Sequence, residues 1–119
     1  YIRIHDRYSY TELEKIFDET DIMVAPSIWY ETFGFTVLEA LSYGVPVVIS
    51  GNVGAKDILT EKAGFVIEDI SIQKLYEVLQ SITQIKLQTM NKIIVEKQEI
   101  MEIADMTKRI EKECYGWEL

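Results

Sequence analysis

The chain has 119 residues, the size of one domain with a modest core. Its 48% hydrophobic and 27% charged residues exclude disordered and fibrous classes, and no apolar run approaches the ~20 residues of a membrane span. The formal charge of −8, from 12 basic and 20 acidic residues, argues against nucleic acid as a partner.

Two elements are predicted at the start of the chain. Alternating residues from Tyr1 to His5 predict a strand. Ser9, with Glu12 three positions later, forms a capping-box pattern that predicts a short helix ending near Thr20. Because the chain begins inside a strand pattern, we expect it to be a piece of a longer protein.

A strand, loop and helix are predicted next. The continuous apolar run Ile22–Pro26 is typical of a parallel strand covered on both faces, so we expect it at the centre of the sheet. An irregular loop spans residues 27–34. A helix over Phe35–Tyr43 follows, and Gly44 is a natural residue to end it.

The second half of the chain predicts two more strands and further helices. Val45–Ile49 and Gly64–Glu68 have the composition of strands, and apolar residues at helical spacing predict a helix from Ile72 to Ile82. From Ile85 to Cys114 there is no Gly or Pro, which predicts one long helix or two.

Alternating strands and helices predict an α/β fold with a doubly wound, Rossmann-like parallel sheet. Three or four strands are few for such a sheet, so we expect its later half. We place a partial Rossmann-like domain at residues 1–82 and a helical segment at 83–119. Cys114 is the only cysteine, so an internal disulfide and a multi-Cys zinc site are excluded and a cytoplasmic protein is expected.

The loop after the first apolar strand is the first place to look for a ligand site, because open α/β sheets bind ligands beyond the carboxyl ends of their strands. Gly34 stands where this loop becomes a helix. The backbone N–H groups of Gly34, Phe35 and Thr36 would be unpaired there and could hold a phosphate. The alternative is that Gly34 only permits a tight turn.

Glu31 and Glu39 flank this predicted helix start. Carboxylates accept hydrogen bonds from vicinal hydroxyls, so a ligand with sugar hydroxyls on both sides of a diphosphate would fit between them. The alternative is a solvated loop glutamate and a first-turn glutamate that is stabilised by the helix dipole.

These residues carry a family resemblance. The sequence is similar to the donor-binding domain of retaining, nucleotide-sugar-dependent glycosyltransferases of the GT-B fold, specifically family four ("glycosyl transferases group 1"), whose motif is two glutamates separated by seven residues. The matching stretches are Pro26-Ser27, Glu31-Thr32-Phe33-Gly34, Glu39-Ala40, Gly44-Val45-Pro46-Val47 and Gly54-Ala55.

The resemblance implies a role for each matching position. Glu39 would bind the ribose hydroxyls of the nucleotide, and Glu31, the candidate catalytic residue, would hold the transferred sugar near its reacting carbon. The backbone of residues 33–36 (Phe33, Gly34, Phe35 and Thr36) would bind the donor sugar and diphosphate. Transfer would retain the anomeric configuration through front-face attack, with Glu31 in a positioning and charge-stabilising role.

The chain departs from the family pattern at two places. Asp6 stands near the point where a glycine commonly follows the first strand, and Gly54-Ala55-Lys56-Asp57 replaces a Gly-Gly pair followed by glutamate. The Arg and Lys that relatives use on the diphosphate, and the acceptor-binding N-terminal domain, are expected outside this sequence. Alone, the chain should therefore be inactive or nearly so.

The expected partners are a nucleotide-sugar donor and, through the N-terminal domain, a glycan or lipid-linked acceptor. No metal or other cofactor is expected, and the full-length parent could act at the inner membrane surface. The alternatives are a noncatalytic nucleotide-sugar-binding module, an interaction module that self-associates through the C-terminal helix, or another GT-B-like enzyme such as an epimerase or phosphorylase.

Four other residues leave two interpretations open. His5 is either a crevice residue or, more simply, a partly buried structural histidine. Trp29 and Tyr30 could stack on a ligand or pack against a neighbouring loop. Lys56 could supply positive charge to the site or be a solvated lysine.

Overall fold

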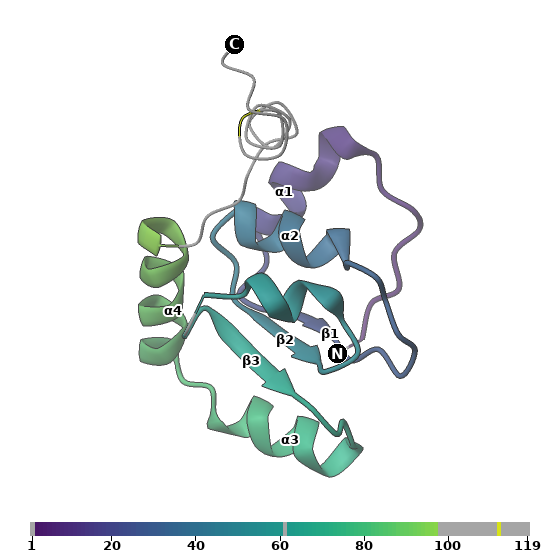
Figure 1. The fold of residues 1–119 in the computed structure, drawn as a ribbon. Helices are drawn as coiled ribbons and strands as arrows, with labels where there is room; N and C mark the ends of the chain where they lie inside the picture. The colour runs from purple at the N-terminus through teal and green to yellow at the C-terminus, as the bar shows by residue number, and fades with distance from the viewer. Residues whose placement is uncertain (1, 61, 98–111, 113–119) are drawn as a thin grey trace.

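The computed structural model describes residues 2–60, 62–97 and 112, which form a parallel sheet with helices on both faces (Figure 1). The strands, in the order β1-β2-β3, are β1 (Met23–Ala25), β2 (Val47–Ser50) and β3 (Gly64–Ile67). The helices are α1 (Leu13–Asp18), α2 (Phe35–Ser42), α3 (Ile72–Ser81) and α4 (Gln84–Lys97), with 3-10 helices η1 (Tyr10–Glu12) and η2 (Gly54–Ile58). The predicted α/β class is confirmed.

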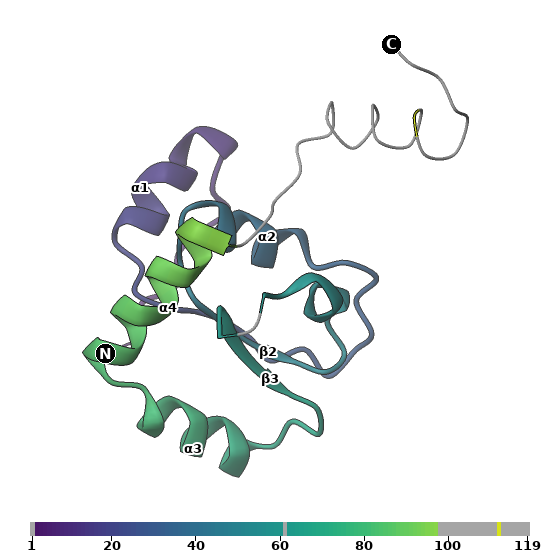
Figure 2. The same cartoon turned by 60° about the vertical axis from the view of Figure 1, so that its left-hand side comes forward.

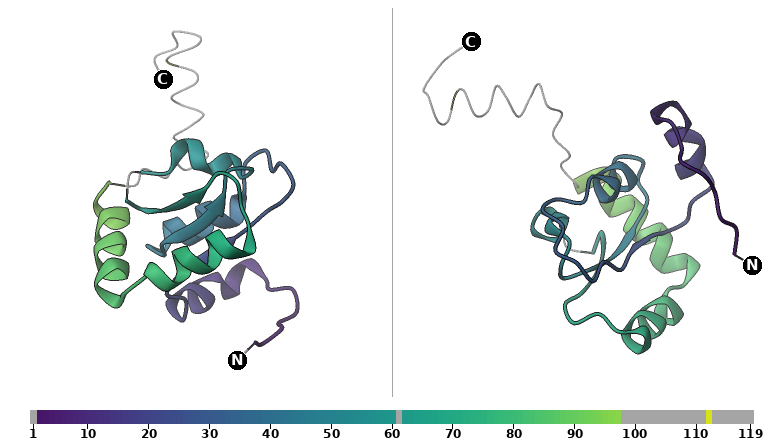
Figure 3. Two further views of the ribbon diagram at one scale, coloured as in Figure 1. Left: turned by 90° about the horizontal axis from the view of Figure 1, so that it is seen from below. Right: turned by 90° about the vertical axis from the view of Figure 1, so that its right-hand side faces the viewer.

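The helices cover both faces of the sheet, and loops occupy the end where the strands finish. α2 and η2 cover one face of the sheet and α3 covers the other, as seen from two directions (Figures 1 and 2). α4 stands at the end where the strands begin, and the loop that leads into α2 lies at the end where they finish (Figure 3). Loops at that end of a parallel sheet are where ligands are bound in open α/β folds.

β2 is the central strand among those described, and all of its residues are buried. Our prediction that Ile22–Pro26 would be central is wrong for the described sheet, in which β1 is an edge strand that pairs with β2 alone and Val24 is 36% exposed. A run of apolar residues indicates a strand but does not encode how many neighbours that strand has.

Residues 2–5 do not form the predicted strand. This segment has no regular secondary structure, and Ile2 and Ile4 are 94% and 95% exposed. A strand is stabilised by hydrogen bonds and side-chain packing with a neighbouring strand. None of the described strands pairs with these residues, so their alternating pattern alone does not make them a strand.

The predicted cap before the first helix is confirmed. The backbone N–H of Ser9 donates to Oε2 of Glu12 at 2.7 Å, and the Ser9 hydroxyl donates to the same atom at 3.0 Å. These two hydrogen bonds, the backbone one first, lower the pKa of Glu12 because they favour its charged form. Together they fix where η1 and α1 begin.

The core lies between the α2 side of the sheet and the surrounding helices. Val47 and Ile49 of β2 face it, and Leu41 of α2 and Ile94 of α4 fill it. The helix predicted from Ile85 begins at Gln84 and is described to Lys97; residues 98–111 and Cys114 lie outside the described residues. Within the described residues, every helix is too short or too polar to cross a membrane.

Candidate functional site

The start of α2 is built around Gly34, as the sequence predicts. Gly34 has φ +82°, a left-handed conformation that costs glycine little, and α2 begins at the next residue. A Cβ at this position would lie 2.7 Å from Cγ1 of Val53, which is fully buried. Gly34 is therefore required both by its backbone conformation and by the close approach of the β2–η2 loop.

The backbone amides at this helix start are open. Among the described residues, no hydrogen-bond acceptor is found for the backbone N–H of Gly34, Phe35 or Thr36, whereas Val37 N–H donates to the Gly34 carbonyl at 3.0 Å. Phe35 is 73% exposed, so solvent reaches this point. Residues 27–44 contain no Lys or Arg, so that stretch supplies positive charge only through backbone N–H groups.

The Glu31 carboxylate lies beside the same helix start. Its Oε2 is 3.7 Å from the point that a Cβ on Gly34 would occupy. A carboxylate is stabilised near a helix N-terminus because that end carries partial positive charge. The structure thus brings together Glu31 and the Gly34 amide group, two parts of the predicted site.

Glu39 lies farther along α2 and is half-buried. It is the fifth residue of the helix, so it lies beyond the first turn, and its Oε2 is buried without a hydrogen-bond partner among the described residues. The alternative of a first-turn glutamate stabilised by the helix dipole does not describe this residue. A buried acceptor without a donor loses its hydration for no compensating bond, at a cost of about 1–3 kcal/mol.

Four aromatic residues lie on the loop before α2 and at the start of that helix. The rings of Phe33 and Phe35 lie on either side of Gly34 in the sequence, with centroids 5.4 Å apart and a tilt of 54°. Trp29 and Tyr30, on the loop before Glu31, are 77% and 91% exposed. The interpretation that these two side chains pack against a neighbouring loop is therefore wrong, and they are free to contact a ligand.

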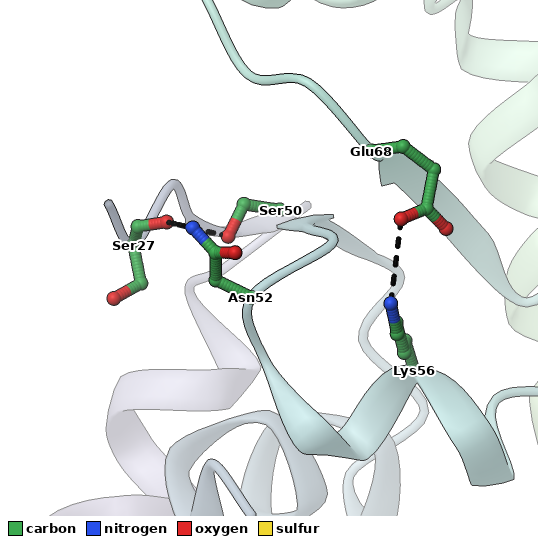
Figure 4. Close-up of polar contacts among 5 residues, drawn as sticks. All are labelled: Ser27, Ser50, Asn52, Lys56 and Glu68. Atoms are coloured by element: carbon green, nitrogen blue, oxygen red, sulfur yellow. Dashed lines mark hydrogen bonds and ion pairs between the residues drawn. The ribbon is translucent and has the colours of Figure 1, made fainter. Parts of the chain in front are cut away.

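The remaining candidates lie apart from this arrangement or have other partners. Lys56, on η2, forms an ion pair at 3.3 Å with Glu68, which directly follows β3 (Figure 4). Asp57 is exposed, and His5 is exposed rather than a partly buried structural histidine. Among the described residues, no three His, Cys, Asp or Glu side chains cluster closely enough to hold a metal ion.

Comparison with known proteins identifies the family of this fold and site. The family described as glycosyl transferases group 1 matches residues 2–105. The chain belongs to the group 1 glycosyltransferases. It is also 43% identical over 47 residues to an uncharacterized glycosyltransferase of Methanocaldococcus jannaschii, and 32% identical over 73 residues to an uncharacterized 41.2 kDa protein in the cps region of Klebsiella pneumoniae.

These matches are partial in length. The aligned segments cover 40% and 60% of this chain, and they span 12% and 20% of the two relatives. In this group 1 glycosyltransferase chain, Glu31 of the predicted pair lies on a loop, and Glu39 lies on α2, the helix that this loop enters. Val53, whose side chain closes the space beside Gly34, was not predicted, because its role comes from contact between two loops.

Proposed function

We propose that this chain is the donor-binding part of a retaining hexosyltransferase. In this proposal a nucleotide diphosphate sugar is the donor, and a glycan or lipid-linked molecule is the acceptor. The observation that carries it is the buried Oε2 of Glu39, which has no hydrogen-bond partner among the described residues, on a helix whose amino end is open and has the Glu31 carboxylate beside it.

Each group supports binding of one part of such a donor. Glu39 offers a desolvated acceptor, which suits the vicinal hydroxyls of a ribose. The amides of residues 34–36 suit the diphosphate, since they have no acceptor among the described residues and lie at the positive end of the helix dipole. Glu31, on the adjoining loop, is placed to accept from hydroxyls of the transferred sugar.

In the proposed reaction the sugar keeps its anomeric configuration. The acceptor hydroxyl attacks the anomeric carbon from the face that the diphosphate leaves, forming the new C–O bond as the bond to phosphate oxygen breaks. The acceptor proton passes to the leaving diphosphate. Glu31 holds the sugar and stabilises positive charge at the anomeric carbon, and the helix-start amides stabilise the departing anion.

Donor binding to the complete protein tests this proposal. Calorimetric titration with a panel of UDP-, GDP- and ADP-sugars should identify one that binds. Glu39→Ala should then weaken its binding by roughly 10- to 150-fold, the equivalent of losing charge-assisted hydrogen bonds of ~1.5–3 kcal/mol.

A matched control is available on another helix. Glu77 of α3 is exposed and accepts from Gln73 at 2.7 Å, so Glu77→Ala removes a helix glutamate away from the site and should leave donor affinity unchanged. Equal donor affinity in the Glu39→Ala variant and the unaltered protein would contradict the ribose role.

Product analysis separates this proposal from the other functions that the sequence left open. A retaining transferase should give a glycosylated acceptor whose anomeric configuration, read by NMR, matches that of the donor. Release of the donor unchanged would indicate a binding module, and turnover of a sugar phosphate in place of the nucleotide sugar would indicate a phosphorylase.

A further inference from the structure

We propose that Ser50 and Asn52, which follow the central strand, are positioning residues for Glu31. This inference rests on the proposed function, in which Glu31 binds the sugar, and gives Ser50 and Asn52 the role of holding the Glu31 carboxylate in place. Ser50 is the last residue of β2, and Asn52 stands two positions later (Figure 4). Both side chains act through the backbone of the loop that carries Glu31, by hydrogen bonds to its Ser27 carbonyl.

The first tie is made at the beginning of that loop. The Ser50 hydroxyl donates to the Ser27 carbonyl at 2.6 Å, and the Asn52 side-chain amide donates to the same oxygen at 3.3 Å (Figure 4). Ser50 is fully buried, the one buried polar side chain within the described residues. A buried hydroxyl that donates to a carbonyl fixes that peptide group, because breaking the bond would leave the Ser50 hydroxyl desolvated and unpaired.

The second tie is made at Glu31 itself. The Glu31 N–H donates to the Asn52 carbonyl at 2.9 Å, and the Gly54 N–H donates to the Glu31 carbonyl at 3.0 Å. These two bonds make a parallel bridge between Glu31 and Val53 outside the sheet. Both peptide groups of Glu31 are therefore held by the β2–η2 loop, and only its side chain is left to meet a ligand.

Close packing prevents this arrangement from sliding. A Cβ on Gly54 would overlap the carbonyl oxygen of Thr32, and Val53 already fills the space beside Gly34. The two loops thus contact each other twice. Gly54 lies against the backbone of Thr32, and the Val53 side chain lies against the backbone of Gly34. Ser50 and Asn52, which lie 23 and 25 positions from Ser27 in the sequence, therefore set the position of the Glu31 carboxylate.

The expected consequence is a separation between turnover and nucleotide binding. Glu31 is proposed to hold the sugar, and it stands on the loop that is tied at Ser27. Glu39 is proposed to hold the nucleotide, and it stands on α2, which also packs against β1 and β2. Displacing a substrate-positioning group by about 1 Å can cost roughly 100-fold in rate. Loosening the loop should therefore lower kcat and leave the affinity for free nucleoside diphosphate unchanged.

The test compares Ser50→Ala and Asn52→Ala with a matched control in the complete protein. Ser81→Ala is the control, because the Ser81 hydroxyl also donates to a backbone carbonyl, that of Val78 at 2.8 Å, but does so on α3. We expect kcat to fall roughly 10- to 100-fold in the two loop variants, with nucleoside diphosphate affinity within about 2-fold in all three. Ser50→Thr, which keeps the hydroxyl, should recover most of the lost kcat.

Hydrogen exchange gives a readout that does not depend on activity. The amides of Glu31 and Gly54 should exchange about 10-fold faster in Ser50→Ala and Asn52→Ala, and at the original rate in Ser81→Ala. Unchanged exchange at both amides, or equal losses of kcat and nucleotide affinity, would overturn the positioning role. If the unaltered protein turns over no nucleotide sugar while these amides still respond, the proposed function fails and the tie between the loops stands.

Discussion

Helices α2 and α3 lie on opposite faces of the sheet and differ in what they bury (Figures 1 and 2). α2 has three fully buried side chains, Val37, Ala40 and Leu41. α3 has none, although its apolar residues have the clearer helical spacing, and Ile72 is 92% exposed. The comparison shows that apolar periodicity predicts where a helix forms, whereas burial depends on how many other elements pack against it.

The difference also bears on function. α2 contacts β1, β2 and η2, whereas α3 makes its main contacts with β3. The helix that follows Gly34 and carries Glu39, the proposed ribose-binding residue, is thus the one held on several sides. A binding group on a well-packed helix keeps its geometry when no ligand is present, which lowers the cost of ordering the site on binding.

The largest expected effect comes from the same substitution made on both helices. Leu41→Ala should destabilise the protein by about 2–5 kcal/mol, because Leu41 is 2% exposed and its removal leaves a cavity. Leu79→Ala on α3 should cost less than about 1 kcal/mol, since Leu79 is 40% exposed and alanine favours helix. Urea unfolding monitored by circular dichroism measures both values. Equal losses would show that α3 is as firmly packed as α2.

Much of the fold could be predicted from local signals. The buried run at β2, the left-handed Gly44 after α2 and the Ser9–Glu12 cap are each set by neighbouring residues, and each is confirmed. The strand expected from Tyr1 to His5 does not form over its described residues 2–5, and the central place expected for β1 is wrong, because strand pairing joins distant segments and leaves no local signal.

The candidate site, like the fold, could be predicted only in part from local signals. The spacing of Glu31, Gly34 and Glu39 predicted a loop glutamate, a glycine at the helix start and a glutamate on the helix, which is where the structure places them. The hydrogen bonds from Ser50 and Asn52 were not predicted, since they join two loops that are distant in the sequence. A polar residue at the end of an apolar strand was the available signal.

An intermediate effect is expected where α2 ends. Gly44 has φ +76°, and a Cβ there would lie 2.8 Å from Nδ2 of Asn91, which donates to the Gly44 carbonyl at 2.8 Å. Gly44→Ala should therefore cost about 1–3 kcal/mol through backbone strain and displacement of Asn91. Thermal unfolding measures the loss.

A second variant separates the two causes. In Gly44→Ala combined with Asn91→Ala the side-chain clash is gone, so any stability still missing beyond that of Asn91→Ala alone reports the backbone strain. If Gly44→Ala is as stable as the unaltered protein, the left-handed conformation is not required to end α2. α3 has no such link, since its last residues run into Ile82 with an extended backbone.

The smallest effect is expected at the start of α3, where Ser71 accepts a hydrogen bond from the Lys74 N–H at 3.2 Å. Losing such a cap costs a helix about 1 kcal/mol. Because α3 buries no side chain fully, Ser71→Ala should open this helix locally and leave the main unfolding transition in place. Hydrogen exchange should accelerate about 5-fold at the Lys74 amide, whereas Ser71→Asp, which keeps a capping oxygen, should not change it. If Ser71→Ala lowers the free energy of the main unfolding transition as much as Leu41→Ala does, α3 unfolds together with the core. The two helices would then not differ in how firmly they are packed.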